Sequence, residues 1–220
     1  EEKYVNSFSI CLARQGGYLT IGGQNPKYFY NKSQPVMLRY YNSGQYQIRV
    51  NKLSMNGEEV SGIQDFADAT GKFLDSGTTM IYLTNSIRTK LLAKLSTFCA
   101  LQSTNCGGTE PKIYKENVCY ERDMERWPNL EAFLYSFPNF TFGLDGNQEH
   151  TLTGVEYLFA QRAGKETYCL GFYELGNRII LGGIFMKNHD FHFDKEQKIL
   201  TISKADCSTA AEIATTGEDR

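Results

Sequence analysis

Apolar and polar residues alternate along several short segments of this chain, and that pattern predicts β-strands. The alternation is strict over residues 45–51, where it places Tyr46, Ile48 and Val50 on one buried face. The Asn56-Gly57 pair that follows is typical of a tight hairpin turn. By the same criteria, further strands are predicted at 17–23, 139–144, 167–172, 178–181, 190–194 and 199–202.

A different spacing predicts one clear helix near the middle of the chain. Either Thr84 or Asn85 can cap its start, because both side chains can accept a hydrogen bond from a free backbone N–H. Apolar residues then recur at helical spacing, at Ile87, Leu91, Leu92 and Leu95. A second short helix is predicted within 127–135. The predicted fold is therefore mostly β with one or two short helices over residues 1–207, and the small polar residues of 208–220 predict a tail or linker.

The composition fits a folded, β-rich domain and excludes several classes of function. Hydrophobic residues make up 41% of the chain, with 14 Tyr and 14 Phe, which is typical of a domain with a sizeable core. The 23 basic and 25 acidic residues are evenly mixed, so no basic patch predicts nucleic-acid binding. The longest apolar run, 179–186, is too short to span a bilayer. Phosphate-loop, dinucleotide-binding and Gly-x-Ser-x-Gly motifs are absent from the sequence.

The six cysteines predict an oxidising compartment. Their number is even and no Cys-x-x-Cys pair is present, which favours three disulfides over a zinc or redox centre, although spacing alone leaves the connectivity open. Sequons at Asn31 and Asn139 agree with a secretory route, to a vacuole, a lysosome or the cell exterior. No leader precedes Glu1, so an exported protein would reach this form as a processed chain or a fragment. The alternative is a cytosolic protein with six buried thiols.

Two of the three histidines, His189 and His192, lie close together in the sequence. Positions three apart on a strand face opposite sides, so this pair has poor geometry for a shared metal ion. Two partly exposed strand or turn residues are the preferred interpretation. We therefore expect no metal ion and no cofactor.

One carboxylate stands among small hydroxylated residues, between two apolar runs, in the segment 72–83 (KFLDSGTTMIYL). Burying an ionised carboxylate is costly unless hydrogen bonds compensate it, and Gly and hydroxyl donors are the residues that could do so. The part FLDSGTT resembles the second active-site loop of pepsin-like aspartic proteases, in which two apolar residues precede Asp-Thr/Ser-Gly-Thr. The same four small residues could also form an ordinary surface turn.

Other segments resemble the same family in the same order along the chain, over about residues 5–203. They are 16–23 (GGYLTIGG), 137–142 (FPNFTF) with Leu152 and Tyr157, 179–185 (IILGGIF) and 191–194 (FHFD). In the family the first lies at the junction of the two lobes, and the apolar-apolar-Gly strand crosses behind the aspartate loop. The resemblance therefore implies the C-terminal lobe of a bilobal pepsin-like fold.

The resemblance also implies an activity, the hydrolysis of peptide bonds in a polypeptide substrate by an aspartate-activated water. Asp75 matches the C-terminal lobe's catalytic aspartate. Ser76 would bond across the contact between the lobes, Gly77 would let the backbone approach the carboxylate, and Thr78 would donate its hydroxyl to it. Thr79 would line the substrate cleft. The second aspartate belongs to an N-terminal lobe that this chain does not contain, so we expect the chain alone to be inactive.

A disulfide pattern follows from the same resemblance. Cys119 and Cys169 match a pair that the family commonly joins inside this lobe. Cys11 and Cys207 resemble a pair found in membrane-linked members, so an anchor through a segment outside this chain is consistent with the pattern. Cys99 and Cys106 remain as the third pair.

The chain departs from the family pattern in one respect, because it has no second Asp-Thr/Ser-Gly motif. Residues 68–71 (DATG) do not substitute for it. Two alternatives to a half-enzyme are therefore kept. One is a catalytically silent pepsin-fold binding or inhibitor protein, and the other is a homodimeric protease in which two copies of Asp75 meet. In the family the pocket residues come from both lobes, so the resemblance implies that both lobes determine the cleavage preference.

Overall fold

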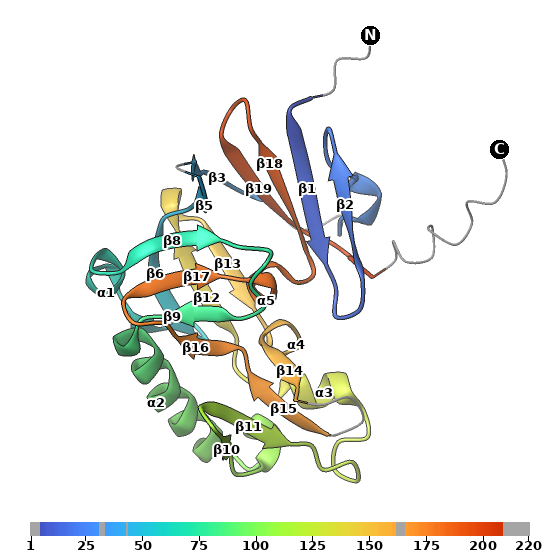
Figure 1. Cartoon of the computed structure of the whole chain (residues 1–220). Coiled ribbons are helices and arrows are strands. Elements are labelled where there is room, and N and C mark those ends of the chain that lie inside the picture. The colour runs from blue at the N-terminus through green and yellow to red at the C-terminus, as the bar shows by residue number, and fades with distance from the viewer. Residues whose placement is uncertain (1–4, 31–33, 43, 162–165, 209–220) are drawn as a thin grey trace, which may run out of the picture.

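The computed structural model describes residues 5–30, 34–42, 44–161 and 166–208. Within these ranges the chain is mostly β, as predicted, but it has five α-helices rather than one or two (Figure 1). The helices are α1 (Ile63–Ala67), α2 (Asn85–Leu101), α3 (Leu130–Tyr135), α4 (Gly154–Tyr157) and α5 (Gly183–Met186). The strands are β1 (Ser7–Leu12), β2 (Gly17–Ile21), β3 (Val36–Arg39), β4 (Tyr41–Asn42), β5 (Tyr46–Gln47), β6 (Val50–Met55), β7 (Glu58–Ser61), β8 (Thr70–Leu74), β9 (Ile81–Leu83), β10 (Lys112–Tyr114), β11 (Asn117–Glu121), β12 (Phe140–Leu144), β13 (Glu149–Leu152), β14 (Leu158–Ala160), β15 (Thr167–Leu170), β16 (Phe172–Glu174), β17 (Arg178–Leu181), β18 (His189–Asp194) and β19 (Ile199–Lys204).

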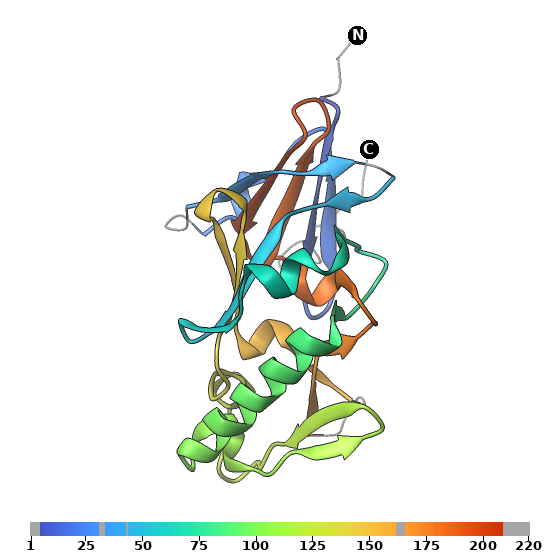
Figure 2. The same cartoon turned by 90° about the vertical axis from the view of Figure 1, so that its left-hand side faces the viewer.

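The strands form four sheets around one main hydrophobic core. A five-stranded antiparallel sheet, β2-β1-β18-β19-β3, stands at one end of the molecule (Figure 1). A six-stranded sheet, β16-β9-β17-β8-β5-β4, crosses the middle, and β13-β12-β6-β7 packs behind it. The small sheet β10-β11-β15-β14 lies at the far end beside α2, which Figure 2 shows running along the outside of the body.

The predicted long helix is confirmed. Thr84 is its N-cap residue, and its hydroxyl accepts a hydrogen bond from the Ile87 N–H at 3.4 Å. Ile87, Leu91 and Leu95 are fully buried on one side, as their spacing predicts. The second helix, α3, is shorter than the predicted 127–135, because the Asn129 side chain caps it and Pro128 precedes that cap.

The prediction of one continuous strand over 45–51 is wrong, because the segment contains two strands, β5 and the start of β6. The chain breaks between β5 and β6, since β5 pairs with β8 in one sheet and β6 pairs with β12 in another. The buried side of the segment is as predicted for Ile48 and Val50, and Tyr46 is half-buried. The predicted segment 167–172 is likewise divided at Gly171 into β15 and β16, which belong to different sheets.

Three disulfides join the described cysteines in the pairs that the family resemblance implies. Cys11–Cys207 ties β1 to the segment after β19, Cys119–Cys169 connects register partners on β11 and β15, and Cys99–Cys106 closes a loop at the end of α2. In the part of the chain that the structure describes, no helix is long and apolar enough to cross a bilayer. The Asn139 sequon is exposed, whereas Asn31 and residues 209–220 of the predicted tail lie outside the described ranges.

The two faces of the five-stranded sheet differ in chemistry. Phe8 and Phe193 stack at 4.9 Å on the face toward the core. On the other face, Asp190 has no exposed surface, and the Gln24 amide donates to its Oδ2 at 3.4 Å. Burial raises the pKa of Asp190 to about 6, although the Gln24 amide and the neighbouring Ser9 oppose this shift.

Because Asp190 is buried, we expect the lobe to lose stability as the pH rises from about 4 to about 7. Its pKa is higher in the folded state than in the unfolded chain, so the stabilisation is complete below the unfolded value and is lost as the pH rises to about 6. Asp190→Asn removes the titration with little change of shape. Between about pH 4 and 7 the free energy of unfolding of the unmodified protein should fall, and that of the variant should fall by up to about 3 kcal/mol less. Urea unfolding across this range, with the disulfides intact, checks the result.

The control for this measurement is Glu196→Gln, which changes an exposed carboxylate in the turn between β18 and β19. If the free energies of unfolding of the Asp190→Asn and unmodified proteins changed equally with pH, the pKa of Asp190 would not be raised by folding.

Candidate active site

The segment 75–79 connects β8 to β9, and hydrogen bonds fix the Asp75 carboxylate at its start. The Gly77 N–H donates to Asp75 Oδ1 at 3.0 Å, and the Thr78 hydroxyl donates to Oδ2 at 2.6 Å. Each carboxylate oxygen thus has its own donor. The carboxylate is half-buried, and these bonds replace part of the water that it loses. This is the arrangement expected for Gly77 and Thr78 from the sequence.

The loop backbone has a turn that brings the chain close to the carboxylate. The Thr78 N–H donates to the Asp75 carbonyl at 3.1 Å. A Cβ atom on Gly77 would lie only 3.2 Å from Asp75 Oδ1, so this position favours glycine. Ser76 and Thr79 are exposed. Ser76 also lines a small cavity of about 60 Å³ with Phe8 and other apolar residues.

A second segment, the end of β17 and the start of α5, supports the loop from behind. Leu181 accepts from the Asp75 N–H at 3.1 Å, Gly183 donates to the Thr78 carbonyl at 2.7 Å, and Ile184 donates to the Thr79 carbonyl at 2.9 Å. A Cβ atom on Gly182 would lie 2.3 Å from the Met80 carbonyl oxygen, so the close crossing requires glycine there. The apolar-apolar-Gly segment therefore crosses behind the aspartate loop, as the family resemblance implies.

A histidine pair, one member fully buried and the other half-buried, lies next to α5. His150 on β13 is fully buried and its Nε2 bonds the Phe185 carbonyl at 2.8 Å. The His189 ring meets it edge-on, with 4.6 Å between centroids. Burial lowers the pKa of His150 to about 3, and the neighbouring His189 acts in the same direction. The pair was missed in the sequence because its members are far apart along the chain.

The predicted relation between His189 and His192 holds, since they lie on opposite faces of β18. Among the described residues, no group of three or more His, Cys, Asp or Glu side chains is arranged to hold a metal ion.

Beside the aspartate loop, the five-stranded sheet presents an apolar strip on its β2 edge. Phe8 pairs with Ile21 and Ile10 pairs with Leu19, so all four side chains share one face. Phe8 and Ile10 also line the small cavity at Ser76, which makes the strip continuous with the loop. Leu19 is 62% exposed and Ile21 is 69% exposed. The two exposed side chains extend the apolar strip to the edge of the sheet.

Comparison with known proteins gives a consistent result. A family model described as "Xylanase inhibitor C-terminal" matches residues 45–204. Aspartyl protease family protein 1 from Arabidopsis thaliana is 27% identical over 213 residues, covering 96% of this chain and 38% of that protein. Cathepsin D from Chionodraco hamatus is 28% identical over 212 residues, covering 91% and 46%. Plasmepsin V from Plasmodium falciparum is 21% identical over 278 residues, covering 91% and 45%. The chain thus spans less than half the length of these relatives.

His150 predicts a loss of stability in acid, opposite in sign to the effect of Asp190. Its folded pKa, about 3, is below its usual 6.5, so its contribution is complete above about pH 6.5 and falls as the pH drops toward 3. His150→Gln keeps an amide donor for the Phe185 carbonyl without this titration. The variant's free energy of unfolding should therefore fall less steeply between about pH 6.5 and 3.5, by up to about 1.4 kcal/mol per pH unit.

Chemical denaturation at several pH values measures this slope. The Asp190→Asn protein serves as the comparison, because its slope should change with the opposite sign. An unchanged slope for His150→Gln would show that His150 is protonated in the folded lobe.

Proposed function

The chain belongs to the pepsin-like aspartic protease family, of which it is the C-terminal lobe, and on that premise we propose that it supplies one half of an aspartic endopeptidase. The observation that carries the proposal is the Asp75 carboxylate, which two donors hold in a loop that the Gly182–Gly183 crossing supports. A carboxylate fixed in this way can act on a water molecule at the edge of a cleft.

The proposed chemistry needs two carboxylates around one water. Two like charges close together cannot both ionise cheaply, so the pair shares one proton. The ionised carboxylate takes a proton from the water as that water attacks the peptide carbonyl, and the protonated one donates to the developing oxyanion. Asp75 is one member of this pair. The other would come from an N-terminal lobe, a part of the protein outside this chain.

The apolar strip on β2 supports the proposed partner lobe. Leu19 and Ile21 are exposed next to the cavity that Ser76 lines, at the edge where a second lobe could continue the sheet and close the cleft. In that arrangement the exposed Ser76 hydroxyl would meet the other lobe's loop. Thr79, also exposed, would contact the polypeptide substrate.

We place the protein in the secretory pathway, in a vacuole or lysosome or outside the cell. The three disulfides support this, because such bonds persist in oxidising compartments. The exposed Asn139 sequon is a compatible glycosylation site.

One observation favours a second candidate function, a catalytically silent binding or inhibitor protein. The matching family model carries the description of a xylanase inhibitor, and such a protein would use the same fold without hydrolysis. The bonded Asp75 loop supports the protease instead, because a silent protein has no need for the donors that hold the carboxylate. A homodimer joined at Asp75 is a further alternative, and the lobe's size and its disulfide pattern favour the two-lobed enzyme.

Asp75→Asn in the full two-lobed protein should abolish peptide hydrolysis at acid pH. The amide has nearly the same shape but cannot share the proton or activate the water. Activity should fall by at least about a hundredfold, the lower end for removing general acid–base catalysis. A quenched-fluorescence peptide assay measures it, and an unchanged urea midpoint shows that the fold is intact. Retention of more than a few per cent of activity would exclude Asp75 from catalysis, and an inactive unmodified protein would favour the silent binding function.

The 220-residue chain alone should cleave no peptide. A single Asp75 cannot hold the base and acid roles together, and without a second wall the scissile bond is not positioned. The test combines light scattering with the same assay and a transition-state-mimicking inhibitor of aspartic proteases. An inactive monomer that gains activity when the N-terminal lobe is added is the expected result. Inhibitor-sensitive turnover that tracks with a dimer would favour the homodimer instead.

A further inference from the structure

A second concave site lies at the β3 edge of the five-stranded sheet, away from the aspartate loop. It is a pocket of about 840 Å³ between this sheet, β13 and the helices α3 and α4. Strands β2 and β3 are the two opposite edges of the sheet. A lobe that covers Leu19 and Ile21 on β2 would therefore leave this pocket open.

Two tyrosines stand at the rim of the pocket. Tyr30 is 51% exposed and Tyr135 is 56% exposed, although both line the concavity. The floor is formed in part by apolar side chains, among them Val36, Val155 and Ile202. Exposed tyrosines around a partly apolar hollow are typical of protein interaction sites, where a flat ring gives a large contact area with little loss of side-chain entropy.

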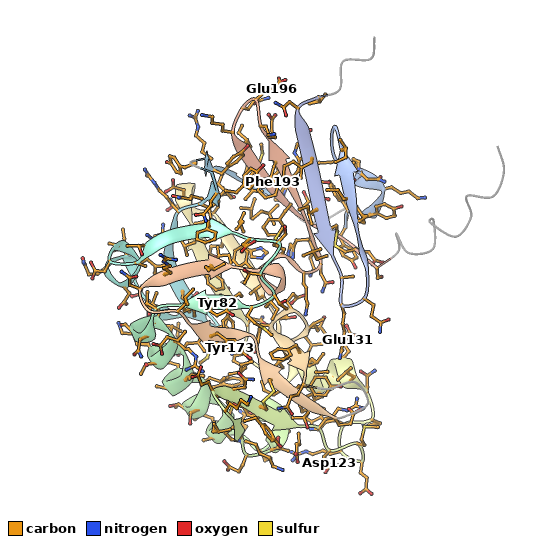
Figure 3. All side chains as sticks on the ribbon, viewed as in Figure 1. Tyr82, Asp123, Glu131, Tyr173, Phe193 and Glu196 are labelled. Carbon is orange, nitrogen blue, oxygen red and sulfur yellow. A yellow bond between two sulfur atoms is a disulfide. The ribbon has the colours of Figure 1, made fainter. Side chains whose placement is uncertain are left out.

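The charge around these rings is negative. Glu131 lies one helical turn before Tyr135 on α3, and its carboxylate and that of Glu156 both raise the pKa of the Tyr135 phenol, after the larger effect of burial. Burial and the Asp206 carboxylate raise the pKa of Tyr30. Figure 3 shows Glu131 beside α3 and α4, below the five-stranded sheet. Carboxylates from three parts of the chain, Glu131, Glu156 and Asp206, therefore lie close enough to the two tyrosines to raise the pKa of their phenols.

This charge is balanced in part at the Asn188 end of the pocket, where the Lys187 ammonium donates to the Glu156 carbonyl at 3.2 Å. Glu156 is buried, and it accepts hydrogen bonds from the Thr153 hydroxyl and the Asn188 amide, which are neutral donors. Lys204 also lines the pocket, and it stands opposite His189 in the β18–β19 register, where its charge acts on that imidazole. Among the described residues Glu131 on α3 is in no ion pair, so a negative charge remains at that end of the pocket.

We propose that this pocket binds an arginine side chain of an extended segment of a partner polypeptide. The guanidinium would lie against the rings of Tyr30 and Tyr135 by cation–π contact and pair with the Glu131 carboxylate, and the aliphatic stem would cover the apolar floor. Charge complementarity selects this occupant over an acidic peptide. The inference does not depend on Asp75 being catalytic.

The experiment measures peptide binding to the full-length protein that carries Asp75→Asn, so that no peptide is cleaved. Two fluorescently labelled pentapeptides are compared by anisotropy at low salt, one with a central arginine and one with a central citrulline, which has nearly the same shape but no charge. An inhibitor that fills the proteolytic cleft is present throughout. The arginine peptide should bind at least about fivefold more tightly than the citrulline peptide.

Variants assign the binding to the pocket. Tyr135→Ala and Glu131→Gln should each weaken binding of the arginine peptide by about two- to fivefold. Glu196→Gln is the matched control, since this exposed glutamate lies at the far tip of the sheet (Figure 3) and should leave binding unchanged.

Several results would overturn the proposal. They are equal affinity for the two peptides, no binding of the arginine peptide up to about 1 mM, and binding that neither pocket variant changes. Loss of a dimer in the Tyr135→Ala protein by light scattering would identify a second copy of the chain as the occupant instead.

Discussion

The close backbone crossing between the aspartate loop and the segment from the end of β17 to the start of α5 is the constraint on which the rest of this lobe depends. Three backbone hydrogen bonds join the two segments, at Asp75, Thr78 and Thr79. They form only because Gly182 has no side chain to meet the carbonyls of Thr78 and Met80. The loop is thereby held from the back, and the carboxylate of Asp75 is held from within by Gly77 and Thr78. Both supports come from backbone groups or a short hydroxyl, so little side-chain entropy opposes them.

The same crossing contacts one of two buried groups whose protonation affects stability, His150, and the other group is Asp190. The Phe185 carbonyl, two residues after Gly183, accepts from His150, whose burial favours the neutral imidazole. On the outer face of the neighbouring sheet, Asp190 is buried in a way that favours the protonated acid. The two groups act in opposite directions over the same mildly acidic range, so the dependence of stability on pH in that range is smaller than either group alone would produce. A neutral His150 and a protonated Asp190 coexist only between their two pKa values, which is an acidic window.

The site could be predicted from the sequence to the extent that its residues are consecutive. Asp75, Gly77 and Thr78 lie within four positions, and their hydrogen bonds are local. Helix α2 was equally readable, because a cap and a helical period are local patterns. The break after β5 could not be found, since alternation continues through Ile48 and Val50 while the chain changes sheets. The His150–His189 contact and the pocket at Tyr135 also escaped detection, because they arise from strands and helices that only the tertiary fold brings together.

The two edges of the five-stranded sheet differ in a way that bears on both proposals. At β2 the exposed side chains are aliphatic, Leu19 and Ile21, and an aliphatic surface beside the aspartate loop suits a permanent neighbour that excludes water. In the pocket beside β3 the exposed side chains are the rings of Tyr30 and Tyr135 and the carboxylate of Glu131, and such a surface tolerates solvent when it is empty. A permanent contact and a reversible one therefore require different chemistry, and the sheet keeps them three strands apart. Because β1, β18 and β19 are paired between the two edges, occupation of the pocket leaves the proposed contact at β2 undisturbed.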